Sequence, residues 1–422
     1  MRLSRKLTQL LSLSLISVML NACSSIHQPD SGRYAELSRT LDQQVSDGVM
    51  PGSVTYIVKD GKVAYHHVNG FQDIDSHTPM HDDSLFRWYS MSKPITSVAI
   101  MMLQEQGKLS VNDPLANYLP EFSAVRVYAA GELDNMQTVA AERPITLADL
   151  LAHTSGITYH FTGTTPVHQY YRKYGVKRDT PVGSLPSDGA PAKSLRQLVE
   201  RLANAPLLHQ PGERFTYSYS TTVLGHVIER VSGMSLDAFL QQQLFEPLGM
   251  TQTSFFVTGE ALNHFVTNYV MTDTGLQMIE NNQNTDYKDR QRLLDGGGAL
   301  AGTAADYLKF VSMLANGGVY QGKRYLSAAA LKQMFQPHIR LDSAGNGESI
   351  GFGYGFALGS QATEQLGFMP AGTVGWAGSG NTLFWLNPHS GDLMVFMTQV
   401  ITPPPFDKSA PFRKILIDAQ QH

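Results

Sequence analysis

The sequence predicts an α/β protein of the α+β kind, in which both ends of the chain build one sheet around an inserted, mainly helical domain. Runs of β-branched and aromatic residues occur near the start, at residues 53–65, and near the end, at residues 381–387 and 391–400. Between about 125 and 290, strand signals are few and helical patterns recur. We therefore expect an α/β domain formed by residues 34–125 and 290–422, and a helical insertion domain formed by residues 126–289.

The length and composition are those of a globular protein. A chain of 422 residues is too long for one ordinary core, so one large domain or two interleaved domains are expected. Hydrophobic residues make up 42% and charged residues 16%, which excludes disordered and fibrous classes. The net charge is −4 and no run of basic residues occurs, which argues against nucleic acid as a partner.

The first 22 residues are expected to be a signal peptide. Arg2, Arg5 and Lys6 form a positive start, and residues 7–20 are mostly apolar. The apolar stretch is too short for a good transmembrane span. Removal of residues 1–22 takes away three basic residues and no acidic ones, so the net charge changes from −4 to −7.

The signal peptide ends in Leu20-Asn21-Ala22-Cys23, which resembles the lipobox of bacterial lipoproteins. The resemblance implies cleavage before Cys23 and a lipid on its sulfur. An ordinary secretory signal with an incidental cysteine is the alternative, but Cys23 is the only cysteine of the chain, which also rules out an internal disulfide. We expect residues 23–33 to be a tether and the protein to be held by its lipid in the bacterial cell envelope. Ser24 favours the outer membrane, facing the periplasm.

Further elements follow from local patterns. Residues 34–49 are expected to form a helix, and Asp60-Gly61 is the turn of a hairpin over residues 53–65. Residues 95–106 have apolar side chains on one helical face and end at Gly107. The other expected helices cover residues 145–151, 195–203 and 222–231.

Ser90 and Lys93 are the candidate nucleophile and its activating partner. Ser90 is the only serine with a lysine three residues later, and residues three apart share a helical face. Pro94 is tolerated only in a first helical turn, so the helix must begin close to Ser90. A serine hydroxyl needs an adjacent base to act as a nucleophile. The alternative is that Ser90 or Ser92 merely caps the helix and Lys93 is solvated.

The residues around Ser90 resemble the motif of a known family. The segment from Phe86 to Thr96 resembles the nucleophile motif of the serine β-lactamase and penicillin-binding protein superfamily, and is most similar to class C β-lactamases and family VIII carboxylesterases. The resemblance spans roughly residues 35–405 and implies a β-lactamase/transpeptidase-like fold with an antiparallel sheet flanked by helices. Further matching blocks, in order, are Pro51–Ser53, Leu150–Gly156, Pro211–Ser218, Leu224–Gly233, Gly296–Ala304 and Gly375–Gly378.

The second motif of this family is Tyr-x-Asn, and here it is Tyr217-Ser218-Tyr219. The resemblance assigns Tyr217 as the general base that works with Lys93. A phenol titrates near ~10 in water and needs a cation beside it to act as a base at neutral pH. Tyr219 is a rival for this role, since residues two apart share a face of an extended segment. Tyr219 also replaces the asparagine that binds the amide side chain of β-lactam substrates.

The third motif is usually Lys-Thr-Gly or His-Thr-Gly, and here Trp376-Ala377-Gly378 stands in its place, as in family VIII esterases. The resemblance implies that the N–H groups of Ser379 and Ser90 form the oxyanion hole. Gly378 is expected to let the backbone approach the substrate. Trp376 lines the pocket or is a packed aromatic residue.

Two other kinds of site are poorly supported. Ser349 lies in a Gly-x-Ser-x-Gly pattern, but a nucleophile elbow needs a strand before the serine and a helix after it. We interpret that segment as a turn entering a strand. No His-Glu-x-x-His motif or cysteine pair occurs, so no metal and no cofactor are expected.

The sequence therefore predicts a serine hydrolase that forms an acyl-enzyme on Ser90. A carboxylesterase for small-molecule, short-chain esters is the leading hypothesis. A β-lactamase or D-alanyl-D-alanine peptidase is the main alternative, and a non-catalytic binding lipoprotein on the same scaffold is another. Nothing in the sequence indicates the oligomeric state.

Overall fold

The computed structural model describes residues 32, 34–179, 188–342, 349–403 and 409–421. Within them, a nine-stranded antiparallel sheet has the order β12-β13-β14-β15-β16-β17-β1-β2-β3. The two ends of the chain meet in its middle, because β1 pairs with β17. The expectation of one sheet built from both termini is confirmed. Its strands are β1 (Gly52–Lys59), β2 (Lys62–Asp73), β3 (Thr78–Pro79), β12 (Ile339–Asp342), β13 (Ser349–Phe352), β14 (Ala357–Leu358), β15 (Val374–Ala377), β16 (Leu383–Leu386) and β17 (Leu393–Met397).

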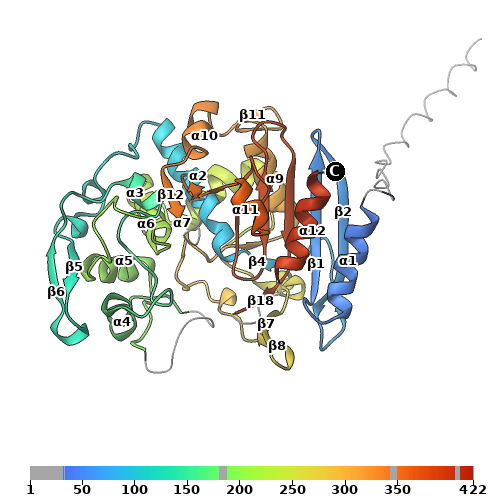
Figure 1. Ribbon diagram of the computed structural model, residues 1–422, viewed down its shortest axis with the longest axis horizontal. Coiled ribbons are helices and arrows are strands. Elements are labelled where there is room, and N and C mark those ends of the chain that lie inside the picture. The colour runs from blue at the N-terminus through green and yellow to red at the C-terminus, as the bar shows by residue number, and fades with distance from the viewer. Residues whose placement is uncertain (1–31, 33, 180–187, 343–348, 404–408, 422) are drawn as a thin grey trace, which may run out of the picture.

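Helices cover both faces of this sheet. They are α1 (Ala35–Ser46) and α12 (Ser409–Gln421) on one face, and α2 (Ser92–Glu105) and α9 (Ala304–Ala315) on the other. In Figure 1, α12 and α1 lie together although they come from opposite ends of the chain. Successive side chains of a strand point to opposite faces, so Val54, Tyr56 and Val58 of β1 join the core with α2 and α9, while Ile57 packs under α1 and α12.

The helical part lies on the side of the molecule away from α1 and α12, at the left of Figure 1. Its central helix, α6, contacts α2, α3, α5 and α7, so it joins the two parts of the molecule. The expected helices at 145–151, 195–203 and 222–231 are present as α3, α5 and α6. The helices of this part are α3 (Leu147–Leu151), α4 (Pro166–Lys173), α5 (Leu195–Asn204), α6 (Ser220–Ser232), α7 (Leu236–Leu240) and α8 (Glu246–Leu248).

The expectation of a mainly helical region over 126–289 misses two hairpins. These are β5 (Arg126–Ala130) with β6 (Gln137–Ala140), and β7 (Asn268–Thr272) with β8 (Gly275–Glu280). Most side chains of β5 and β6 are exposed, which weakens the alternation that marks a strand. β7 also pairs in parallel with β18 (Val400–Ile401), so this hairpin lies against the end of the α/β part rather than in the helical part.

Two short strands connect the segment before Ser90 with the segment after residues 296–298. β4 (Phe86–Arg87) pairs with β9 (Ala301–Gly302), which follows the glycine block at 296–298.

In the described part of the chain, no helix is long and apolar enough to cross a membrane. The remaining elements are β10 (Val319–Tyr320), β11 (Lys323–Arg324), α10 (Ala328–Met334) and α11 (Gln361–Gln365).

Candidate active site

Ser90 lies at the start of the buried helix α2. It occupies the middle of the 3₁₀ turn η1 (Tyr89–Met91), which leads directly into α2 at Ser92. The first turn of a helix leaves N–H groups without intrahelical partners and carries partial positive charge. The Ser90 side chain is only half-buried, whereas the apolar side chains of α2 up to Leu103 are buried. Ser90 is thus held by a rigid element while remaining accessible.

Two side chains contact the Ser90 hydroxyl. The Tyr217 hydroxyl donates a hydrogen bond to Ser90 Oγ over 2.6 Å, and Lys93 Nζ donates another over 3.2 Å. Lys93 is one helical turn from Ser90, as the spacing of the two residues predicts. Tyr217 comes from the segment just before α6. The structure therefore brings the three expected catalytic residues together.

The Lys93 ammonium is enclosed by protein. Its side chain is 1% exposed, and Nζ donates to the carbonyl oxygen of Gly297 over 2.6 Å. Nζ also lies 4.7 Å from the ring centre of Tyr217 and 5.5 Å from that of Tyr159. A buried cation must be compensated by acceptors or ring faces. These contacts fix Lys93 in reach of both Ser90 and Tyr217.

A buried acidic residue, Asp295, anchors the loop that carries Gly297. Asp295 accepts hydrogen bonds from Gly297 N over 2.8 Å and from Thr222 Oγ1 of α6 over 2.6 Å. Its other oxygen lies 3.0 Å from Arg178 Nε. The only signal in the sequence was the position of Asp295 directly before three glycines. Its partners are distant along the chain, so spacing could not reveal them.

Tyr217 is surrounded by aromatic rings. The rings of His153, Tyr159 and Trp376 lie with their centres 5.1, 5.2 and 5.6 Å from the centre of Tyr217. His153 Nδ1 is hydrogen-bonded to Ser218 Oγ over 3.0 Å. Complete burial, together with the nearby Lys93 charge, holds the pKa of the His153 imidazole well below its usual value. His153 is therefore neutral and frames Tyr217.

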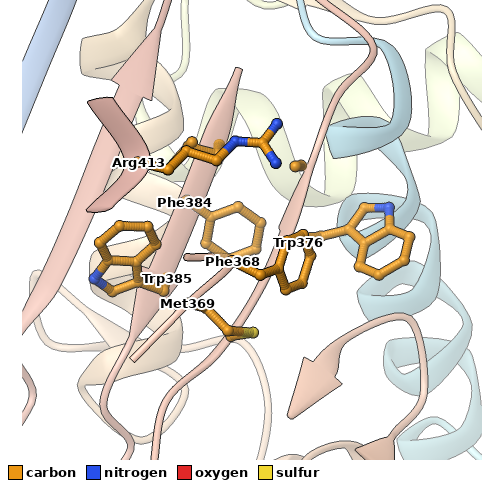
Figure 2. A pocket seen from close by; sticks show the side chains of 8 residues that line it. Phe368, Met369, Trp376, Phe384, Trp385 and Arg413 are labelled. Atoms are coloured by element: carbon orange, nitrogen blue, oxygen red, sulfur yellow. The ribbon is translucent and has the colours of Figure 1, made fainter. Parts of the chain in front are cut away.

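Trp376 extends from β15 toward Tyr217. Its ring also packs against Phe352 and Phe368, and its indole N–H is buried without a hydrogen-bond partner among the described residues. Trp376, Phe368 and Trp385 help to line a cavity of about 10 Å³, shown in Figure 2. That volume holds one water molecule at most, so this cavity is not a substrate pocket.

The third-motif region lies against the segment that precedes Ser90. A Cβ atom on Gly378 would lie 2.5 Å from the carbonyl oxygen of Trp88, so only glycine permits this approach. We expected Gly378 to let the backbone approach the substrate. In the structure, Gly378 lies against the backbone of Trp88, two residues before the nucleophile. Ser379 is exposed, and its N–H makes no hydrogen bond to the described residues.

Tyr219 is placed differently from the sequence-based expectation. The segment after Tyr217 does not stay extended, because α6 begins at Ser220 and Tyr219 is the residue that precedes it. Tyr219 is 1% exposed, and its hydroxyl is hydrogen-bonded to His160 Nδ1 over 2.9 Å. Burial raises the pKa of the Tyr219 phenol. Tyr219 is thus a buried neighbour of Tyr159, offers no open surface to a substrate and is a poor candidate base.

The other candidates are placed as follows. Ser349 begins strand β13, and the next element is strand β14 rather than a helix, in agreement with the interpretation of its segment as a strand entry. Cys23, the expected lipidation site, lies outside the described residues. Among the described residues, no three His, Cys, Asp or Glu side chains lie close enough together to hold a metal ion.

Comparisons with known proteins identify the family. The Beta-lactamase family model matches residues 37–419. Protein Rv1367c of Mycobacterium tuberculosis is 32% identical over 381 residues, covering 87% of this chain and 89% of that protein. Esterase EstB of Burkholderia gladioli is 32% identical over 224 residues, covering 52% of this chain and 51% of EstB.

A solved structure supports the same assignment. EstCE1, described as a hydrolase with promiscuous acyltransferase activity, superposes with a TM-score of 0.74 at 27% identity, covering 92% of this chain and 99% of EstCE1. The fold is therefore the expected β-lactamase/transpeptidase-like fold. Since the family model spans nearly the whole described chain, this protein belongs to the beta-lactamase family and is a serine hydrolase.

Proposed function

We propose that the protein is a carboxylesterase that forms an acyl-enzyme on Ser90. The observation that carries the proposal is the pair of hydrogen bonds on Ser90 Oγ, from Tyr217 over 2.6 Å and from Lys93 over 3.2 Å. A nucleophile within hydrogen-bond reach of a base, with a third group that orients the base, is the arrangement that covalent catalysis requires.

The reaction runs in two steps. The reactive form carries the Tyr217 phenolate, whose proton has passed to solvent and whose negative charge the Lys93 ammonium stabilises. Ser90 Oγ then attacks the ester carbonyl carbon while its proton passes to the Tyr217 oxygen. Collapse of the tetrahedral intermediate breaks the bond to the alcohol oxygen, which takes the proton from Tyr217. Water then attacks the carbonyl carbon of the acyl-enzyme and gives one proton to Tyr217. Collapse of this second intermediate breaks the bond between the acyl carbon and Ser90 Oγ, which takes the proton from Tyr217 as the acid is released.

Two backbone N–H groups suit the charge that develops on the carbonyl oxygen. The Ser90 N–H lies in the first turn before α2, and the Ser379 N–H makes no hydrogen bond to the described protein. Donors that are already in place stabilise an oxyanion without reorganisation. We assign these two groups as the oxyanion hole.

Trp376 supports an ester over a β-lactam or a peptide. Those substrates carry a carboxylate near the scissile bond, and loss of one charge-assisted hydrogen bond costs about 1.5–3 kcal/mol. Trp376 places an uncharged ring 5.6 Å from Tyr217, where the resembling β-lactamases have a lysine or histidine. The likeness to EstB and EstCE1 supports the same choice.

The proposal is tested by kcat/KM for p-nitrophenyl butyrate, a chromogenic cephalosporin and a D-Ala-D-Ala peptide at one pH and salt concentration. We expect the ester to be favoured by roughly ten-fold or more, the ratio that one lost charged contact produces. Ser90→Ala should abolish hydrolysis and fluorophosphonate labelling, whereas Ser349→Ala should change neither. A cephalosporin value at or above that of the ester would favour the β-lactamase alternative.

A further inference from the structure

Tyr89, the residue directly before the nucleophile, has a strained backbone. Its φ is +45°, in the left-handed region that residues with a side chain seldom adopt. Such a conformation persists only where the surrounding structure holds it in place. Because Tyr89 and Ser90 share a peptide bond, the backbone of Tyr89 sets the direction of the Ser90 N–H.

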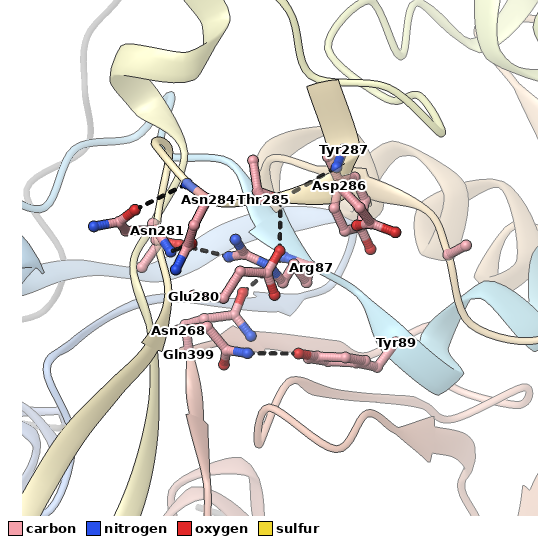
Figure 3. Close-up of polar contacts among 12 residues, drawn as sticks. Arg87, Tyr89, Asn268, Glu280, Asn281, Asn284, Thr285, Asp286, Tyr287 and Gln399 are labelled. Carbon is pink, nitrogen blue, oxygen red and sulfur yellow. Dashed lines mark hydrogen bonds and ion pairs between the residues drawn. The ribbon is translucent and has the colours of Figure 1, made fainter. Parts of the chain in front are cut away.

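The Tyr89 side chain is fixed by a buried amide, as Figure 3 shows. Asn268 Nδ2 of β7 donates a hydrogen bond to the Tyr89 hydroxyl over 2.7 Å. Asn268 is fully buried, and its Oδ1 has no hydrogen-bond partner among the described residues. The bond to the Tyr89 hydroxyl is the one hydrogen bond that the Asn268 side chain makes to the described residues. The buried amide is therefore placed to hold the Tyr89 side chain.

A second amide lies on the other side of the same segment. Gln399 Oε1 accepts a hydrogen bond from the backbone N–H of Arg87 over 2.7 Å, and Arg87 Nε pairs with Glu280 Oε2 over 3.0 Å. A Cβ atom on Gly380 would lie 2.3 Å from Gln399 Nε2 and 3.3 Å from the Tyr89 ring. Tyr89 is therefore packed directly against Gly380.

These contacts hold the segment that carries the Ser379 N–H against the segment that carries the Ser90 N–H. Gly378 and Gly380 flank Ser379, and they contact Trp88 and Tyr89, the two residues before Ser90. We propose that Asn268 and the Tyr89 hydroxyl are positioning residues, which set the spacing between the Ser90 and Ser379 N–H groups. This inference rests on the proposed function, because it concerns the oxyanion hole assigned above. It adds a role for β7, which is remote from Ser90 in the sequence.

The test compares the wild type with Tyr89→Phe, Asn268→Leu and the double variant. Tyr325→Phe is the matched control, since it also removes one buried tyrosine hydrogen bond, to the Pro247 carbonyl. We expect Tyr89→Phe to lower kcat for p-nitrophenyl butyrate roughly 10- to 100-fold, the effect of a small misplacement of reacting groups. KM should change less than about two-fold, because the donors act on the transition state. The control should keep the wild-type kcat.

Coupling between the two residues gives a second measurement. If they act only through their mutual bond, the double variant has the kcat of the worse single variant rather than the product of the two losses. Fluorophosphonate labelling should slow in parallel, which separates a misplaced oxyanion hole from altered ester binding. A Tyr89→Phe enzyme with the kcat and labelling rate of the control would overturn the inference alone. A wild type that is neither active nor labelled would overturn the proposed function and the inference together.

Discussion

His153 is a buried titratable side chain next to a catalytic group, and its protonation affects the stability of the protein. Its ring packs against Tyr217, and its Nδ1 is bonded to Ser218. Burial and the Lys93 charge lower its pKa well below 6.5. The unfolded chain, in which the imidazole is free, therefore binds a proton at a higher pH than the folded protein does.

The folded protein is therefore destabilised at acidic pH. Stability is fully present above the unfolded pKa of about 6.5 and falls as the pH drops below it, because the unfolded state gains the proton first. We expect His153→Asn to reduce this loss between pH 7.5 and pH 5, since Asn tolerates the left-handed backbone of this position, φ +56°. Urea unfolding at both pH values checks this. An unchanged pH dependence in the variant would exclude His153 as its source.

Among the individual site residues, local spacing predicted the contact between Ser90 and Lys93, because residues three apart on a helix lie on the same face. Tyr217 came from the family resemblance. Tyr219 was placed on the wrong side, because the start of α6 turns its side chain away from that of Tyr217. Asp295 and Asn268 were missed, since each acts through partners far away in the sequence.

Among the elements, the loop over residues 295–298 links the helical part to the nucleophile. Asp295 pairs with Arg178 and orients Gly297, whose carbonyl holds Lys93. The Asp295 side chain is 3% exposed. Removing one partner of a buried pair leaves the other charge uncompensated.

We therefore expect Asp295→Asn to lower the free energy of unfolding by about 3 kcal/mol and to reduce esterase turnover. Asp134→Asn is the control, because Asp134 makes an ion pair of similar length with Lys173 but is 87% exposed. Its stability and turnover should stay near those of the wild type. Equal losses in both variants, measured by urea unfolding, would mean that burial of Asp295 is not the cause.

Helices and strands differed in how well the sequence revealed them. α2, α5 and α6 carry apolar residues at helical spacing and were expected close to their true bounds. The strands β5 and β6 present mostly exposed side chains, so no alternation marked them. For β7 and β8 the sequence did contain a signal, the turn residues Asp273-Thr274-Gly275. In the structure these residues connect the two strands, and Gly275 has a φ of +105°.

For the whole molecule, we propose that the protein is attached to the bacterial cell envelope by a lipid on Cys23. The support is the single cysteine at the end of the apolar leader. A mature lipoprotein carries more than one acyl chain, which is what stable attachment requires. Mass spectrometry of the membrane-associated protein should show an N-terminal, acylated Cys23. A mature protein that begins after Cys23, or an unmodified Cys23, would contradict this.

The pairing of β1 with β17 has a consequence for how the protein folds. Val54 lies beside Met397. The central strand β1 therefore cannot pair with β17 until almost the whole chain has been synthesised. Contacts between such distant residues slow folding, because a long loop must close before they form. Until then β1 has only its hairpin partner β2, and its other edge is open to pairing with strands of other chains. The newly made protein is thus most prone to aggregation while it still lacks its C-terminal strands.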